Sequence, residues 1–232
     1  MSESIVWISG ATEGIGRALA RTVPYENSRV VNLSRRKHPD LESVQFDLTK
    51  PATYEAVREH FAAELACFRG SRALFIHCAR YSGAPGFTFD TDSDEYCRAL
   101  QANAVAPLVL GSMFLSAVGP GYESGLVLMS SPAASTPIPG RAAYCAGRAA
   151  CEMWVKTAAS ELKLKKPRSW VAAVRPGAHD RQIVSPSSND SGPLQAESDH
   201  ELERAAREIW SALPPRSGTP VLFFDEQINM QW

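Results

Sequence analysis

The chain has 232 residues, of which 44% are hydrophobic and 21% charged, as is ordinary for a soluble globular domain with a substantial core. Its formal net charge of −1 leaves no basic surplus for a nucleic-acid partner or an anionic membrane surface. No uninterrupted apolar run approaches the length of a membrane span, and the N-terminus lacks the layout of a signal peptide. We therefore expect a cytoplasmic protein with neither a nucleic acid nor a membrane as partner.

The first predicted strand is 4–8, a short apolar run with the length of a buried strand. A turn containing Gly10, Gly14 and Gly16 follows it and leads into a helical pattern. Glycines at such a strand-to-helix turn let the backbone approach a pyrophosphate, whose charge the helix N-terminus favours. The spacing departs from the G-x-G-x-x-G fingerprint, so an ordinary tight turn is the alternative interpretation.

The second predicted strand is 29–33, and Ser34, Arg35 and Arg36 follow it. In a dinucleotide-binding fold, an acid at this point binds the free 2′-OH of NAD, whereas Arg accommodates the 2′-phosphate of NADP. Two adjacent arginines without an acid favour NADP(H) over NAD(H). The alternative is a solvated basic turn.

Strands and helices alternate through the rest of the chain. Further strands are predicted over 44–49, 73–77, 125–129, 170–174 and 221–224, and helices over 49–68, 94–118, 141–164 and 201–213. This alternation, without repeats or a linker, predicts an α/β protein: one doubly wound Rossmann domain over 1–232 with a parallel sheet of about seven strands. The polar stretch at about 178–200 is interpreted as a substrate lid or, alternatively, a disordered loop.

Two strand ends carry polar residues with open interpretations. Asp47 ends the strand 44–49 and either contacts a cofactor or caps the helix that begins near Thr49. His77 ends the strand 73–77 and is interpreted as a hydrogen-bonded residue rather than a catalyst.

The five cysteines have spacings that match no zinc site, so we predict reduced thiols and no metal. Cys78 and Cys145 lie near the residues of interest in sequence. A catalytic thiol is one interpretation of that position, and packing of a small side chain is the one we favour.

Two hydroxyls and a cation follow the strand 125–129. Ser131 leaves that strand, Tyr144 begins the helix 141–164, and Arg148 shares a helix face with Tyr144. A phenol titrates near pH 10 in water, about three units above neutrality, and a neighbouring cation favours the phenolate. Taken alone, however, Tyr and Arg four residues apart are common on amphipathic helices.

The glycine turn and the Ser131-to-Tyr144 separation together resemble the short-chain dehydrogenase/reductase family, within it the carbonyl reductase branch of sepiapterin- and benzil-reductase-like proteins. Members carry T-G-x-x-x-G-[IL]-G near the N-terminus and a Ser at this separation before Y-x-x-x-K. The resemblance covers nearly the whole chain. It departs at Arg148, where the family has Lys, and at 77–80, which reads H-C-A-R in place of N-N-A-G.

The resemblance implies roles for named positions. Catalysis is implied for Ser131, Tyr144, Arg148 and Asn103. Cofactor binding is implied for Gly10, Thr12, Gly14, Ile15, Gly16, Ser34, Arg35, Arg36, Asp47, Leu48, Ala79, Tyr144, Arg148, Pro176 and Gly177. Relatives that use NADP often carry a basic residue where this chain has Glu13, which opposes the NADP prediction. An Ala-rich helix like 141–164 often forms a dimer interface in the family, so a homodimer or homotetramer is expected.

Two functions follow. The first is an NADPH-dependent oxidoreductase that reduces a ketone, diketone or aldehyde to an alcohol, or runs in reverse on an alcohol. The second is a catalytically impaired NADP-binding sensor or scaffold of the same fold, motivated by Arg148 and the altered segment 77–80. The substrate wall is expected to be apolar or aromatic, and Tyr81, Ile138, Met153 and His179 are its predicted members.

Overall fold

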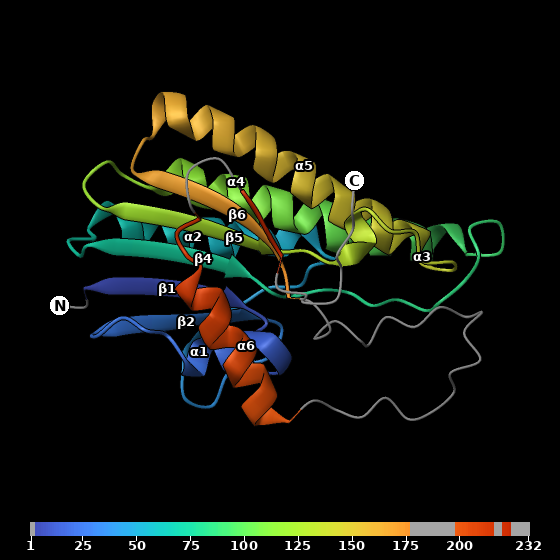
Figure 1. The fold of residues 1–232 in the computed structure, drawn as a ribbon, viewed down its shortest axis with the longest axis horizontal. Coiled ribbons are helices and arrows are strands. Elements are labelled where there is room, and N and C mark those ends of the chain that lie inside the picture. Colours follow the sequence, from blue (N-terminus) through green and yellow to red (C-terminus); the bar gives the residue numbers. More distant parts are fainter. Residues whose placement is uncertain (1–2, 177–197, 216–219, 224–232) are drawn as a thin grey trace.

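The computed structural model describes residues 3–176, 198–215 and 220–223, and its centre is a seven-stranded parallel sheet (Figure 1). The strands are β1 (Ser4–Ser9), β2 (Ser28–Ser34), β3 (Glu42–Gln45), β4 (Arg72–His77), β5 (Glu123–Met129), β6 (Ser169–Arg175) and β7 (Val221–Phe223). Their order across the sheet is β3-β2-β1-β4-β5-β6-β7. The direction of winding thus reverses between β1 and β4, and the predicted Rossmann architecture is confirmed.

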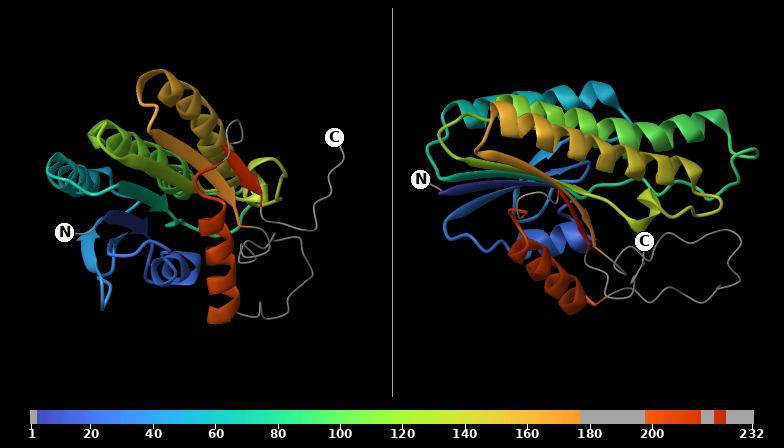
Figure 2. Two further views of the ribbon diagram at one scale, coloured as in Figure 1. Left: turned by 60° about the vertical axis from the view of Figure 1, so that its left-hand side comes forward. Right: turned by 45° about the horizontal axis from the view of Figure 1, so that its top comes forward.

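Helices cover both faces of the sheet (Figure 2). They are α1 (Gly14–Arg21), α2 (Tyr54–Ala66), α3 (Ser93–Leu100), α4 (Ala106–Ala117), α5 (Ala142–Lys165) and α6 (Asp199–Ser211). Helices α2, α4 and α5 share one apolar core with the sheet, and α1 and α6 share the other. Successive residues of β1 supply the two cores in turn, because side chains alternate across a strand: Trp7 packs in the first and Ile8 in the second.

The strand predicted over 44–49 is too long, because β3 ends at Gln45. The chain turns at Asp47, whose Oδ1 accepts hydrogen bonds from the Thr49 N–H at 2.9 Å and the Thr49 hydroxyl at 2.8 Å. Such a side-chain-to-backbone turn competes with continued strand pairing. A short 3₁₀ segment, η1 (Pro51–Thr53), then leads into α2.

The helix predicted over 94–118 is interrupted in its middle. A π-helical turn, η2 (Gln101–Val105), separates α3 from α4, and such turns are frequent at functional sites. By length and composition the stretch Ser93–Ala117 could cross a membrane, with a mean hydropathy of 1.4. Leu110 and Phe114 of this stretch are fully buried in the core, and 39% of its most apolar window is buried inside the fold.

The predicted lid at about 178–200 falls almost wholly on 177–197, outside the described residues, as do Gly177 and His179. Its last residues are described: Ser198 caps α6 by accepting from the Glu201 N–H, while the Glu201 carboxylate accepts from the Ser198 N–H at 2.9 Å. The lid and the single-domain boundary stay predictions.

Candidate active site

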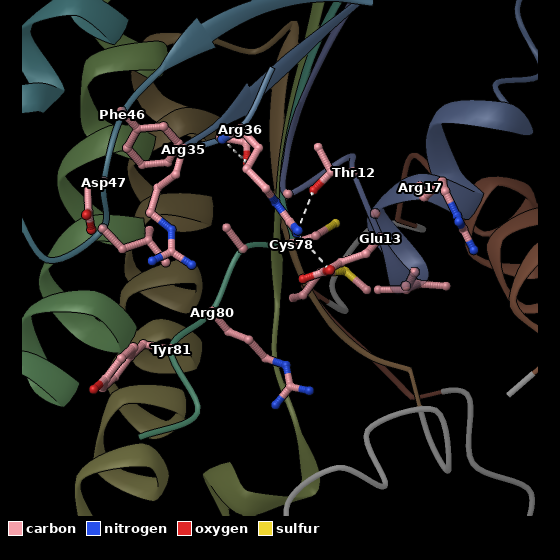
Figure 3. A pocket seen from close by; sticks show the side chains of 18 of the residues that line it. Thr12, Glu13, Arg17, Arg35, Arg36, Phe46, Asp47, Cys78, Arg80 and Tyr81 are labelled. Atoms are coloured by element: carbon pink, nitrogen blue, oxygen red, sulfur yellow. Dashed lines mark hydrogen bonds and ion pairs between the residues drawn. The ribbon is translucent and has the colours of Figure 1, made fainter. Parts of the chain in front are cut away.

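A cavity of about 1000 Å³ lies where the winding of the sheet reverses, at the carboxyl ends of the central strands (Figure 3). Its wall comes from the turns after β1, β2, β3 and β4, from the end of β5 and from the start of α5. Ligands of open α/β sheets bind at this place, because loops diverge there on either side of the strand ends.

The glycine turn after β1 shapes one wall of the cavity. Gly10 and Gly14 have φ angles of +74° and +54°, which residues with a Cβ rarely adopt. A Cβ at Gly16 would overlap the carbonyl oxygen of Gly10, and one at Gly10 would come within 3.2 Å of Ala79 Cα. Glu13, the residue before α1, makes no side-chain capping hydrogen bond, so the first N–H groups of α1 are left for an anion. The turn therefore fits a dinucleotide pyrophosphate.

The ends of β1 and β4 are tied together beside this turn. Ser9 Oγ accepts from the Ala79 N–H at 3.0 Å and lies 3.1 Å from His77 Nδ1. Burial, reinforced by the positive charge of Arg148, lowers the pKa of His77 to about 3, so this imidazole is neutral near pH 7. His77 is thus a hydrogen-bonded strand-end residue, as interpreted from the sequence.

The thiol of Cys78 lines the cavity but is a poor nucleophile. Burial raises its pKa to about 12, and the thiolate is the reactive form of cysteine. Packing, the role favoured from the sequence, accounts for Cys78 without a catalytic thiol.

The two arginines after β2 have different surroundings. Arg36 Nη2 lies 2.8 Å from a Glu13 carboxylate oxygen and 3.3 Å from Thr12 Oγ1, so its charge is already opposed by an acid. This pair is exposed, at 64% for Arg36 and 74% for Glu13, and such pairs contribute little stability. Arg35 instead extends beside Phe46 and Asp47 (Figure 3), and within the described residues no carboxylate hydrogen-bonds to it.

Asp47 remains ionised at the rim of the cavity. Partial burial pushes its pKa up, but the hydrogen bonds from Thr49 and the charges of Arg35 and Lys50 outweigh this, so the pKa is lowered overall. Asp47 does not cap a helix, since the residues preceding η1 and α2 are Lys50 and Thr53.

Tyr144 and Arg148 lie together at the start of α5, and both line the cavity. They are almost wholly buried, at 4% and 3% exposure, and the guanidinium carbon of Arg148 lies 4.9 Å from the centre of the Tyr144 ring. Arg148 donates from Nη1 to the Met129 carbonyl at 2.6 Å and from Nη2 to Asn103 Oδ1 at 3.0 Å. A fixed cation thus stands against the phenol, as the helical spacing predicts.

Asn103 sits on the π-helical turn and is buried, not turned to water as a surface amide would be. Its Oδ1 accepts from the Tyr81 N–H at 3.1 Å as well as from Arg148, and its Nδ2 donates to the Tyr81 carbonyl at 2.7 Å. The amide therefore couples the loop after β4 to the cation on α5.

Ser131 is buried at the start of a short 3₁₀ segment, η3 (Pro132–Ala134), which packs against α5. Its Oγ accepts from the Ala133 N–H at 3.3 Å. The cavity wall itself includes the neighbouring Ser130 rather than Ser131.

The described part of the predicted cofactor set lies on one cavity wall. These residues are Gly10, Thr12, Gly14, Ile15, Gly16, Ser34, Arg35, Arg36, Asp47, Leu48, Ala79, Tyr144, Arg148 and Pro176. The wall also holds Lys50, Arg98 and Leu202, which sequence reasoning missed. Lys50 and Arg98 belong to no sequence motif, and Leu202 belongs to the amphipathic pattern of a helix distant in sequence, so no local signal marks them. Of the predicted substrate wall, Tyr81 lines the cavity, whereas Met153 is 63% exposed and does not.

Known proteins resemble this chain in sequence. The sequence profile described as short chain dehydrogenase matches residues 4–192. The benzil reductases ((S)-benzoin forming) of Bacillus cereus and Bacillus subtilis are 23% and 26% identical to the chain; the matches cover 77% and 76% of it and 76% and 74% of those proteins.

Solved structures share the fold. A short-chain dehydrogenase from Streptomyces avermitilis aligns over 97% of this chain and 89% of its own, with a TM-score of 0.71 and 22% identity. A short chain dehydrogenase from Shigella flexneri complexed with NADP aligns over 96% and 97%, with a TM-score of 0.73 and 20% identity. The chain belongs to the short-chain dehydrogenase/reductase family, and it is an oxidoreductase that uses a nicotinamide cofactor and a small-molecule substrate.

Proposed function

We propose that the protein reduces a ketone, diketone or aldehyde to an alcohol with NADPH, or catalyses the reverse reaction. One observation carries the proposal: a phenol stacked against a buried guanidinium opens into the same cavity as a glycine turn suited to a pyrophosphate. Two relatives are named as benzil reductases, and benzil is a diketone, which supports a carbonyl as the reacting group.

The residues divide the chemistry between them. When bound, the nicotinamide cofactor supplies the hydride that reaches the carbonyl carbon. Tyr144 donates its phenolic proton to the carbonyl oxygen, and Ser131 orients that oxygen by hydrogen bonding. Arg148 keeps positive charge beside the phenol while Tyr144 gives up its proton. Asn103 holds the guanidinium in place through its Oδ1.

The alternative function, a sensor or scaffold that binds the cofactor without turnover, is motivated by the same arginine. Both terminal nitrogens of Arg148 donate to protein acceptors, the Met129 carbonyl and Asn103 Oδ1. A cation used in that way has less capacity to hold a cofactor ribose. The following experiment separates the two functions.

The experiment measures NADPH oxidation by absorbance against a panel of ketones, aldehydes, diketones and quinones. We expect turnover by the unmodified protein, and a loss of at least ~10²-fold in kcat for Tyr144→Phe, because the ring stays while the proton donor is removed. NADPH binding, measured by fluorescence, should persist in this variant. Tyr122→Phe serves as the control, because Tyr122 is also buried but directly precedes the amino end of β5 and does not line the cavity. Binding without turnover on the whole panel would favour the sensor.

The cofactor preference is proposed to be NADP(H) over NAD(H), with Arg35 as the main ligand of the 2′-phosphate. A charge-assisted hydrogen bond contributes about 1.5–3 kcal/mol, so Arg35→Ala should lower the preference by roughly tenfold or more. Arg36→Ala should lower it less, because Glu13 already opposes that charge, and Glu13→Gln should raise it. The measurement is kcat/KM with each cofactor, and equal values in the unmodified protein would refute the preference.

A further inference from the structure

A buried carboxylate, Glu152, lies on α5 two helical turns beyond Tyr144, behind the cavity wall. It forms a two-point ion pair with Arg175: Oε1 accepts from Nε at 2.6 Å and Oε2 accepts from Nη2 at 2.7 Å. Glu152 is 6% exposed and Arg175 is 8% exposed. Such a planar, two-bond pair fixes orientation as well as distance.

The pair also holds both ends of the segment that begins at Ser131. Ser130 Oγ donates to Glu152 Oε1 at 2.7 Å, and Arg175 Nη1 donates to Ser135 Oγ at 2.9 Å. Ser130 immediately precedes Ser131, and Ser135 immediately follows η3. Arg175 ends β6 directly before Pro176, which lines the cavity.

We propose that the Glu152–Arg175 ion pair is a positioning device that sets Ser131 and Pro176 relative to Tyr144. A buried ion pair is weak support for stability, because desolvation offsets much of its attraction. Its distinctive effect is geometric: it joins α5, the end of β5, η3 and the end of β6, which carry or adjoin Tyr144, Ser131 and Pro176. The inference rests on the proposed function for its catalytic consequence.

The same sheet offers a comparison carboxylate at the other end of its strands, partly exposed at 29%. Glu123, at the start of β5, accepts from Arg72 of β4 at 3.0 Å and from Trp170 Nε1 of β6 at 2.8 Å. This carboxylate also joins neighbouring segments, but at the amino ends of the strands, away from the cavity. Its loss therefore reports what an interstrand carboxylate does for the fold alone.

The test compares Glu152→Gln with Glu123→Gln, adding Ser130→Ala and Ser135→Ala, which remove single hydrogen bonds and keep the ion pair. Folding is checked by circular dichroism and Tm. We expect Glu152→Gln to lower kcat by ~10- to 10²-fold, since a misplacement of about 1 Å can cost that much. Ser130→Ala should lower kcat at least threefold with Tm and substrate KM little changed. Glu123→Gln should keep kcat within twofold of the unmodified protein.

Two outcomes overturn the proposal. In the first, Ser130→Ala and Glu152→Gln both have a kcat within twofold of that of Glu123→Gln, whatever their Tm. In the second, Glu152→Gln does not fold, and both serine variants keep an unchanged kcat. If the unmodified protein reduces no carbonyl, the proposed function is wrong, but the role of the ion pair can still be tested. NADPH fluorescence titration is then the test: the positioning role requires that the Kd for NADPH rise at least tenfold in Glu152→Gln and less than twofold in Glu123→Gln.

Discussion

At the scale of single residues, Arg148 is the departure from the family pattern that lies against Tyr144. Its guanidinium reaches two acceptors on different elements, the Met129 carbonyl and Asn103 Oδ1, while its face lies over the Tyr144 ring. The planar guanidinium of Arg can donate to both acceptors and lie over the ring at the same time, whereas the ammonium of Lys is a compact point charge. An Arg in place of the family's Lys thus preserves the positive charge beside the phenol but changes the groups to which that cation is hydrogen-bonded.

Charge and shape at this position can be separated by two variants. Arg148→Lys keeps the cation, so the pH at which kcat/KM is half-maximal should stay where it is. Arg148→Met deletes the cation and keeps apolar bulk, so the profile should move to higher pH because Tyr144 loses its positive neighbour. The measurement is kcat/KM from pH 5 to 10 for the three proteins. An unchanged profile in Arg148→Met would mean that position 148 does not act on the phenol.

At the scale of elements, the shape of the turn between β1 and α1 depends on the absence of a Cβ at its glycines. The Gly10 carbonyl occupies the space that a Cβ at Gly16 would need, so the start of α1 packs directly on the end of β1. Any larger residue at Gly16 must push the turn open, and the N–H groups proposed to bind a pyrophosphate would move with it.

Gly16→Ala is therefore expected to weaken NADPH binding by at least tenfold, a change of about 1.4 kcal/mol. Gly121→Ala is the control, since a Cβ there meets no atom within 4 Å and the position is remote from the cavity. Fluorescence titration gives the two Kd values, and circular dichroism checks the fold. Equal affinities for both variants would show that the close packing of this turn does not serve the cofactor.

Much of the fold could be predicted because its signals are local. Apolar runs bounded by turns located the strands to within two residues, except at 44–49, where the Asp47 turn ended pairing early. The π-helical turn around Asn103 gave no periodic signal of its own. Glu152 and Arg175 stand 23 positions apart on a helix and a strand, and only packing brings them together. The glycine pattern and the Tyr144–Arg148 spacing thus mark residues that line the cavity, whereas the sequence gives no signal for the long-range ion pair behind it.

At the scale of the whole molecule, the site depends on both layers of helices. The cavity wall takes Tyr144 and Arg148 from α5 on one face of the sheet, and Ile15 and Leu202 from α1 and α6 on the other. Arg17 of α1 also pairs with Asp199 of α6, a surface contact between the two helices of the second layer. The predicted homodimer or homotetramer and the cytoplasmic location stay predictions.

Acid should destabilise this molecule partly through His77. Burial beside Arg148 lowers its pKa to about 3, whereas an unfolded chain protonates histidine near pH 6.5, its ordinary value. The unfolded state therefore binds more protons between these two pH values, so the stabilising contribution is complete above about pH 6.5 and is lost as the pH falls toward 3. Between pH 7 and pH 5, the free energy of unfolding should fall by at least about 1 kcal/mol more in the unmodified protein than in His77→Asn. Urea titrations at both pH values measure this difference, with the exposed His200→Asn as control. Equal losses in the unmodified protein and His77→Asn would show that a buried neutral imidazole is not what acid disrupts.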